Sequence, residues 1–281
     1  MTDRLQELIG AAAAPRRAPE PLRVLLIGDV VGPSGSRALF MHLARLKKRS
    51  RCDLVIANVE NSAAGFGLTL AQADEYAGYG IDVMTTGNHI WQQREIWPRL
   101  ESHDRLLRPH NYPPSVPGKG TCIVEAGGVK VGVLNLEGRV AMSHLDCPFR
   151  VARAEVAKLR KETPLVVVDM HAESVEEKEA LALHLDGSVS AVVGTHTHVQ
   201  TADERILPRG TAYLTDLGMT GPRDSVLGMK PDVVLRRALS QMPLRMEVDE
   251  GPADICGALL SVDRVTGKAI ALERIVEHAR L

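Results

Sequence analysis

The chain has 281 residues, a formal net charge of -1 and 44% hydrophobic residues, which is the profile of a folded globular protein and excludes dominant disorder. Its 34 basic residues nearly balance its 35 acidic ones, which argues against duplex DNA or an acidic membrane as the main partner. The four cysteines form no Cys-x-x-Cys pair, so we expect neither a disulfide framework nor a thiolate zinc site. This cysteine usage favours a cytoplasmic location.

The chain begins with a segment that we expect to be a flexible tail, residues 1–22. Charged residues close to the start methionine argue against a secretory signal, and residues 11–21 consist of Ala, Pro, Arg and Glu alone. No later segment reaches the roughly 18 uninterrupted apolar residues that a membrane span needs. Because no linker interrupts the remainder, we expect residues 23–281 to form a single domain.

Short apolar runs alternate with helix-length amphipathic stretches along the rest of the chain. The runs are rich in Val, Ile, Leu or Thr and too short for buried helices, which predicts core strands at residues 23–28, 53–58, 82–87, 129–136, 164–170, 190–195 and 211–216. The stretches between them predict helices at residues 36–49, 69–79, 151–161 and 174–185. This alternation predicts an α/β protein with a layered α/β/α fold.

Three segments are expected to depart from a simple parallel pattern. Residues 129–136 and 255–275 are predicted to be antiparallel pieces, and Thr266-Gly267 within the second is a hairpin turn signal. Residues 108–120 contain four prolines and two glycines, which predicts an extended loop.

Polar residues that can bind metal ions recur where the apolar strands stop. In open α/β sheets, ligands collect at the carboxyl ends of the strands, so residues distant in sequence meet there in one cleft. The residues expected to meet are Asp29, Glu60, Asn61, Asn88, His89, His171, His196 and His198.

These side chains offer oxygen and nitrogen donors without a thiolate, a set that suits manganese, iron or zinc. They exceed the needs of one ion, and two ions about 3.5–4 Å apart that share a carboxylate would use the set fully. Glycines 28, 87 and 194 precede several of them and allow a close approach. We expect His196 and His198 to lie on one face of an extended segment, an arrangement favourable to metals.

Taken together, the segments GD (28–29), NVEN (58–61), GNH (87–89), His171 and GTHTH (194–198) resemble the signature of the calcineurin-like metallophosphoesterase superfamily. Within it, NVENSAAGFGLT (58–69), TTGNHIW (85–91), LRPHNYP (107–113), DMHAE (169–173), GTHTHVQTAD (194–203) and YLTDLGMTGP (213–222) are similar to bacterial YmdB-like phosphodiesterases. The resemblance covers residues 23–275. It implies a four-layer α/β/α fold with mixed sheets.

The resemblance also implies a division of the metal ligands. Asp29 and His198 would bind one ion, Asn88, His171 and His196 would bind the other, and Glu60 would bridge the two. The Asp-x-His motif of the wider superfamily is Asp29-Val30-Val31 here, and Asn61 is the candidate for the ligand position that this leaves open. Ile90 stands where an acidic residue often follows GNH, so the sequence identifies no partner that orients His89.

The activity implied is a metal-dependent phosphodiesterase in which a hydroxide held between two metal ions attacks phosphorus and His89 protonates the leaving oxygen. The implied substrates are 2',3'- or 3',5'-cyclic nucleotides, and the sequence assigns no substrate-binding residues. Iron is the first metal expected, with manganese or zinc as alternatives, and a homo-oligomer is expected. A regulatory module that binds metal and a phosphate ligand with little turnover is the alternative function. An amidohydrolase is disfavoured, because its His-x-His follows the first strand of a barrel.

Overall fold

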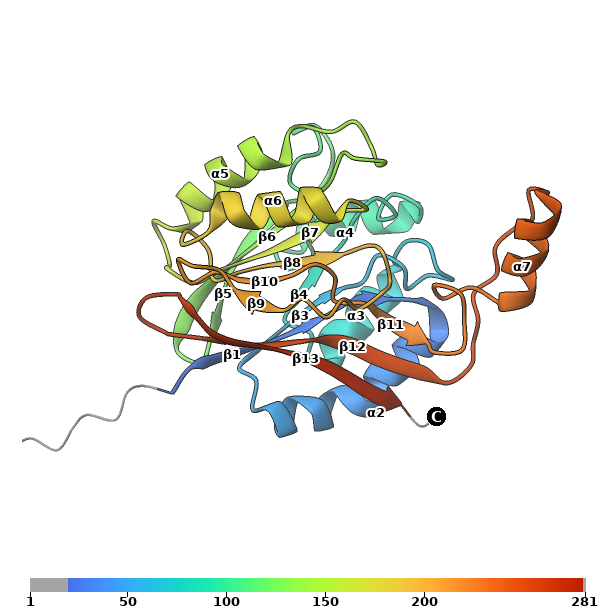
Figure 1. Ribbon diagram of the computed structural model, residues 1–281, viewed down its shortest axis with the longest axis horizontal. Coiled ribbons are helices and arrows are strands. Elements are labelled where there is room, and N and C mark those ends of the chain that lie inside the picture. The colour runs from blue at the N-terminus through green and yellow to red at the C-terminus, as the bar shows by residue number, and fades with distance from the viewer. Residues whose placement is uncertain (1–19, 280–281) are drawn as a thin grey trace, which may run out of the picture.

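The structure, a computed structural model, describes residues 20–279 (Figure 1). The predicted tail therefore lies outside the described residues as far as residue 19. The first strand, β1 (Leu22–Ile27), begins at the last residue of that tail, because the Leu22 side chain is fully buried in the core.

Within residues 20–279 the strands form two mixed sheets. The first has the order β2-β11-β12-β1-β3-β4, with β13 paired to β12. Its further strands are β2 (Asp29–Val30), β3 (Leu54–Asn58), β4 (Val83–Thr85), β11 (Met219–Pro222), β12 (Ala253–Val262) and β13 (Ala269–Ala279). Strands β1, β3 and β4 run parallel, so their carboxyl ends share one edge.

The second sheet has the order β5-β6-β7-β8-β10-β9. Its strands are β5 (Thr121–Ala126), β6 (Val129–Glu137), β7 (Val166–His171), β8 (Ala191–Thr195), β9 (Arg205–Ile206) and β10 (Ala212–Leu214). β6 pairs antiparallel with β5 but parallel with β7, so the expectation of an antiparallel piece is right on one side only. β7, β8 and β10 are parallel.

The two sheets pack face to face with helices outside them. One core cluster joins residues of both sheets, among them Leu26, Val133 and Val167, and it lies between the sheets. A second cluster packs β1 and β3 against α2 (Gly32–Ser50) and α3 (Leu70–Tyr79). A third packs β6 and β7 against α5 (Pro148–Leu159) and α6 (Val175–Leu185). Figure 1 shows α5 and α6 on one side of the sheets and α2 on the other, which confirms the layered α/β/α fold.

Local signals explain where three of the four predicted helices begin. A proline in the first turn starts α2 earlier than expected, because proline there loses no hydrogen bond and has a helical φ. A capping box formed by Thr69 and Gln72 starts α3, and the Ser174 side chain accepts from the backbone N–H of Glu177 at the start of α6. The predicted hairpin is present, with β12 and β13 antiparallel on either side of Thr266-Gly267.

Other elements were not expected. They include β5, the short strands β2, β9 and β11, the 3-10 turn η1 (Arg94–Ile96), α4 (Trp97–Ser102) and α7 (Pro231–Ser240). α7 stands away from the two sheets in Figure 1, and Val233 is its buried residue. Among the helices of residues 20–279, none is long and apolar enough to cross a membrane.

Candidate metal centre

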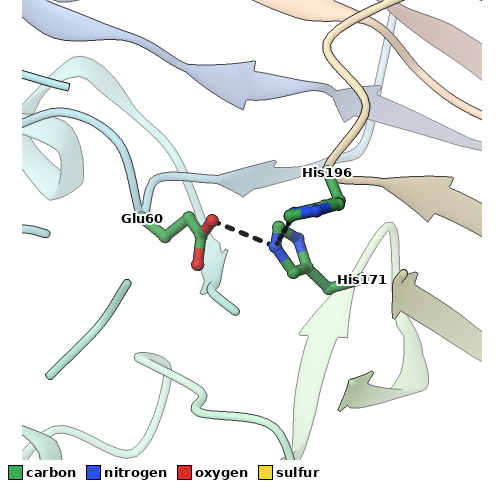
Figure 2. A group of neighbouring side chains, drawn as sticks. All are labelled: Glu60, His171 and His196. Carbon is green, nitrogen blue, oxygen red and sulfur yellow. Dashed lines mark hydrogen bonds and ion pairs between the residues drawn. The ribbon is translucent and has the colours of Figure 1, made fainter. Parts of the chain in front are cut away.

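The candidate site lies where parallel strands of both sheets end. Asp29 follows β1 and Glu60 follows β3 in the first sheet, whereas His171 ends β7 and His196 follows β8 in the second. Figure 2 shows Glu60 and His196 directed toward the ring of His171 from different elements. The strand-end positions thus bring together side chains that lie far apart in sequence.

The Nε2 atom of His171 is the centre of this cluster. It lies 3.0 Å from Oε1 of Glu60, 3.0 Å from Nδ1 of His196 and 3.1 Å from Oδ1 of Asn88. Glu60, His171 and His196 each offer a donor atom, and these atoms lie within 4.8 Å of one another. Converging donors of this kind leave room for a cation between them.

Asp29 lies beside this cluster and is fully buried. Its Oδ2 accepts a hydrogen bond of 3.0 Å from the backbone N–H of His196, but within the described residues its Oδ1 has no hydrogen-bond partner. Burial raises the pKa of the Asp29 carboxyl, against the opposing effect of His198 and His171. A buried carboxylate oxygen that accepts no hydrogen bond is costly, and a bound cation would reduce that cost.

Asn61, His89 and His198 form the outer part of the site. The Asn61 side chain lies 3.1 Å from Nε2 of His198 through Nδ2 and 2.7 Å from Nδ1 of His89 through Oδ1. The His89 backbone N–H donates to Glu60, and the Phe66 ring packs edge-on against the His89 ring with centroids 5.1 Å apart. Asn61 and Phe66 are therefore the partners that orient His89, a role that the sequence left unassigned.

The expectation that His196 and His198 lie on an extended segment is wrong. β8 ends at Thr195, and His196 and His198 have φ angles of 101° and 62°, so the chain turns sharply at both histidines. Asp216 holds the turn, because its Oδ2 accepts from the N–H and the hydroxyl of Thr197 at 3.2 and 2.8 Å. The turn directs one imidazole toward His171 and the other toward Asn61.

Asp216 is in turn paired with Lys178, and sequence reasoning missed both. Lys178 comes from α6, and its Nζ lies 2.8 Å from Oδ2 of Asp216 with both side chains fully buried. The lysine stem passes under Gly194, where a Cβ would lie 2.7 Å from its Cδ. One signal was available, because Lys178 shares the helix face of Leu181 and Leu185, which is otherwise apolar.

A second set of hydrogen bonds fixes the orientation of the His171 ring. Thr195 donates its hydroxyl proton to Asp169 at 2.7 Å, so the same hydroxyl accepts from Nδ1–H of His171 at 2.9 Å. This tautomer leaves Nε2 directed at Glu60, as metal-binding histidines require. Gly87 allows the ring to sit close, because a Cβ there would lie 2.1 Å from Cδ2 of His171.

The side chains of the cluster shift one another's pKa values. Burial alone would lower the pKa of His171, but the carboxylates of Glu60, Asp29 and Asp169 raise it to about 9. Burial alone would raise the pKa of Glu60, but His171 and His89 hold it well below its usual value. Burial and the neighbouring His171 lower the pKa of His196 to about 3. Metal ions bind an ionised carboxylate and a neutral imidazole, which are the forms of Glu60 and His196, and a cation bound at the site would take the place of the proton on His171.

A cavity of about 400 Å³ opens onto the site. Its polar side contains Asn61, His89, His196 and His198, and its other side is largely apolar. A larger cavity of about 470 Å³ lies between α5 and α6, lined by residues such as Arg153 and His184 but by none of the site residues. The cavity beside the histidines is therefore the one relevant to chemistry at the site.

A two-sheet α/β/α fold that gathers carboxylate, amide and imidazole donors at its parallel strand ends defines the chain as a metallophosphoesterase. More narrowly, the chain belongs to the YmdB-like protein family, which matches residues 25–275.

Known proteins extend this family match to nearly the whole chain. The chain is 44% identical over 255 residues to the 2',3'-cyclic-nucleotide 2'-phosphodiesterase of Bacillus subtilis (strain 168), a match that covers 91% of this chain and 97% of that protein. A hypothetical protein from Thermus thermophilus has a similar structure, with a TM-score of 0.86, 39% identity and coverage of 92% of this chain and 100% of that one. A novel phosphatase from Mycoplasma pneumoniae also has a TM-score of 0.86, with 34% identity and coverage of 92% and 94%.

Proposed function

We propose that residues 23–281 act as a single-domain, dinuclear-metal phosphodiesterase that hydrolyses 2',3'-cyclic nucleotides. The observation that carries the proposal is the convergence of Glu60, His171 and His196 beside an open cavity, together with an Asp29 oxygen that accepts no hydrogen bond within the described residues. The 2',3'-cyclic substrate is favoured over the 3',5'-cyclic one because the Bacillus subtilis relative, 44% identical, is a 2',3'-cyclic-nucleotide 2'-phosphodiesterase.

The proposed ligands fall into two groups joined by Glu60. Asn88, His171 and His196 would hold one ion, and Asp29, Asn61 and His198 the other. The position of Glu60 supports a bridging role, because its Oε1 lies 3.0 Å from Nε2 of His171 in the first group and 3.4 Å from Nδ2 of Asn61 in the second. Two ions bound there would supply positive charge for the phosphoryl oxygens and a water of lowered pKa. Iron, manganese and zinc all suit this donor set.

His89 is the proposed general acid. Its Nδ1 is held by Asn61 at 2.7 Å, and the ring lines the cavity. Hydrolysis adds water to phosphorus and breaks the bond to the 2' oxygen, which leaves with a proton and yields a nucleoside 3'-phosphate. Nε2 of His89 is the atom that would deliver this proton, a contribution of roughly 10²- to 10⁴-fold to the rate. The Phe66 ring and Asn61 keep the imidazole aimed at the cavity.

The test is hydrolysis of 2',3'-cyclic AMP by the metal-free protein after addition of manganese, iron or zinc, with products identified by chromatography. We expect metal-dependent formation of adenosine 3'-phosphate, slower turnover of 3',5'-cyclic AMP, and no activity in Glu60→Gln. Tight binding of the cyclic nucleotide without product release for all three metals would contradict the proposal and favour the regulatory module instead.

A further inference from the structure

We propose that the apolar side of the cavity is the subsite for the nucleobase of the substrate, and that it binds bases through contact area without reading their hydrogen-bonding edges. The inference rests on the proposed function, because it assumes that the phosphate lies at the metal centre. We call this surface the apolar wall, and it consists of Phe66, Val226, Leu227, Met229, Val234 and Met246.

The wall and the metal centre face the same space. The cavity of about 400 Å³ that the wall lines is also lined by His89, His196 and His198. With the proposed metal ions bound, a ligand that fills this cavity would place an anionic group at the histidines and an apolar group against the wall. A cyclic nucleotide has this character, since its phosphate can meet the histidines while its flat base lies against aliphatic and aromatic side chains.

The wall is ordered and attached to the site. Val226 and Met229 exchange backbone hydrogen bonds of 2.9 and 3.0 Å, which form a tight turn with Leu227 at its tip. The carbonyl oxygen of Leu227 accepts from Nδ1 of His198 at 3.0 Å, so the position of the turn depends on a proposed ligand. On the opposite loop, the carbonyl oxygen of Phe66 accepts from Gln93 at 3.1 Å.

Apolar side chains of the wall are exposed at the cavity. Leu227 is 50% exposed and Phe66 is 37% exposed, whereas leucine side chains in the core are almost completely buried. Grouped exposed apolar side chains beside a polar site mark a ligand-binding surface, because covering them removes apolar area from water.

The composition of the wall determines how selective it is. Its six side chains have no N–H or O–H group, so they cannot distinguish bases by pairing with their edges. Sites that use hydrogen bonds reject the wrong ligand strongly, whereas apolar contact separates ligands weakly, by their area. We therefore expect adenine, guanine, cytosine and uracil all to be accepted, with the larger purines bound more tightly.

The decisive variant is Leu227→Asn. It removes apolar area from the wall, and asparagine tolerates the positive φ of 53° at this position better than leucine does. The matched control is Leu239→Asn, the same change at a residue of α7 that is 78% exposed and does not line the cavity. Met246→Ala is a second variant of the wall itself.

The substrates are 2',3'-cyclic AMP and methyl β-D-riboside 2',3'-cyclic phosphate, which lacks a base. For Leu227→Asn and Met246→Ala we expect kcat/KM on cyclic AMP to fall about fivefold through KM, with kcat within twofold and the base-free substrate unaffected. Leu239→Asn should match the wild type on both. An equal loss on both substrates, or no loss on cyclic AMP, would overturn the subsite.

A binding measurement separates failure of the subsite from failure of the proposed function. If the wild type hydrolyses neither substrate with any of the three metals, the proposed function has failed. Calorimetry of the metal-loaded wild type and Leu227→Asn with adenosine 3'-phosphate and with base-free ribose phosphate then decides the subsite. Weaker binding of the adenosine compound alone supports it, and unchanged binding of that compound contradicts it.

Discussion

The ammonium group of Lys178 lies 2.8 Å from Oδ2 of Asp216, and neither side chain reaches solvent. Lys178 belongs to the helix that follows His171, whereas Asp216 follows β10 and holds the turn between His196 and His198. This ion pair therefore links the segments that carry proposed ligands from two different strands.

Replacing Lys178 with methionine should weaken metal binding as well as stability. The substitution leaves the Asp216 carboxylate buried without its cation, which costs about 3–5 kcal/mol. We expect a lower Tm in the metal-free protein and a roughly 10- to 100-fold weaker metal affinity, because residues that support ligands act on affinity to that extent. Lys130→Met, which breaks an exposed ion pair with Glu162, is the matched control. Unchanged metal affinity in Lys178→Met would show that the pair is purely structural.

Metal removal should destabilise the protein reversibly. A ligand that binds the folded state alone contributes about 2.7 kcal/mol at a concentration of 100 Kd, so chelation should lower the Tm and addition of manganese, iron or zinc should restore it. In Glu60→Gln, chelation and addition of metal should leave the Tm unchanged, because the substitution removes the proposed bridge. Scanning calorimetry measures both effects. Identical Tm values for chelated and metal-loaded wild-type protein would count against a metal centre.

The substitution Asp29→Asn should abolish the stabilisation by added metal without lowering the stability of the metal-free protein. The Asp29 carboxyl is fully buried, and within the described residues its Oδ1 accepts no hydrogen bond and lies 3.8 Å from Nδ1 of His171, so its ionised form is costly when no cation is bound. We expect the metal-free variant to be at least as stable as the metal-free wild type, but to gain no stability from added metal. Thermal melts with and without metal provide the measurement. A marked loss of stability in the metal-free variant would contradict this explanation.

His89→Ala should reduce turnover according to the leaving group. A general acid matters most for a poor leaving group, so we expect kcat on 2',3'-cyclic AMP to fall by about 10²-fold or more and kcat on bis-p-nitrophenyl phosphate by less than about tenfold. Metal content should stay at the wild-type level. His110→Ala is the control, because His110 lies 3.4 Å from Glu155 and outside the site. Loss of metal from His89→Ala would make His89 a ligand instead.

The pH dependence of stability should include a contribution from Asp254. Burial alone would raise the pKa of Asp254, but hydrogen bonds from Arg223 and His278, each 2.9 Å long, hold it below its usual value. A carboxyl with a lowered pKa in the folded state stabilises the protein above its unfolded pKa of about 3.9, and this stabilisation is lost as pH falls through the folded value. In metal-free protein, Asp254→Asn should therefore lower the Tm more at about pH 6 than at about pH 3. The same deficit at both pH values would refute a charge effect, and Asp232→Asn is the exposed control.

The periodicity of the sequence predicts seven strands, the β12–β13 hairpin and four helices well, because buried strands and amphipathic helices leave strong patterns, but it missed β5. Short elements such as β2 and β11 were missed, since Asp29–Val30 and Met219–Pro222 are too brief to show a period. α7 was missed for another reason. Its leucines are exposed to solvent and do not pack into a core. Its apolar residues therefore did not mark it as a helix that packs against a sheet.

The candidate site was predictable to the extent that strand ends determine position. Glu60, His171 and His196 follow or end strands whose direction the sequence indicates, so their meeting could be predicted. The backbone turn at His196 and His198 could not, because it depends on Asp216, which contacts Thr197 from a distant segment. Long-range hydrogen bonds of this kind have no local signature, and the same holds for Asn61 as the partner of His89.

The two sheets contribute different donors to one centre, and this division has a consequence for heat inactivation. Sliding of one sheet over the other by about an ångström would separate Glu60 from His171 while leaving every strand intact, and catalytic geometry tolerates little more than that. Turnover should thus fade on warming at temperatures where circular dichroism still reports full secondary structure. Loss of activity would therefore report movement between the two sheets before the secondary structure melts.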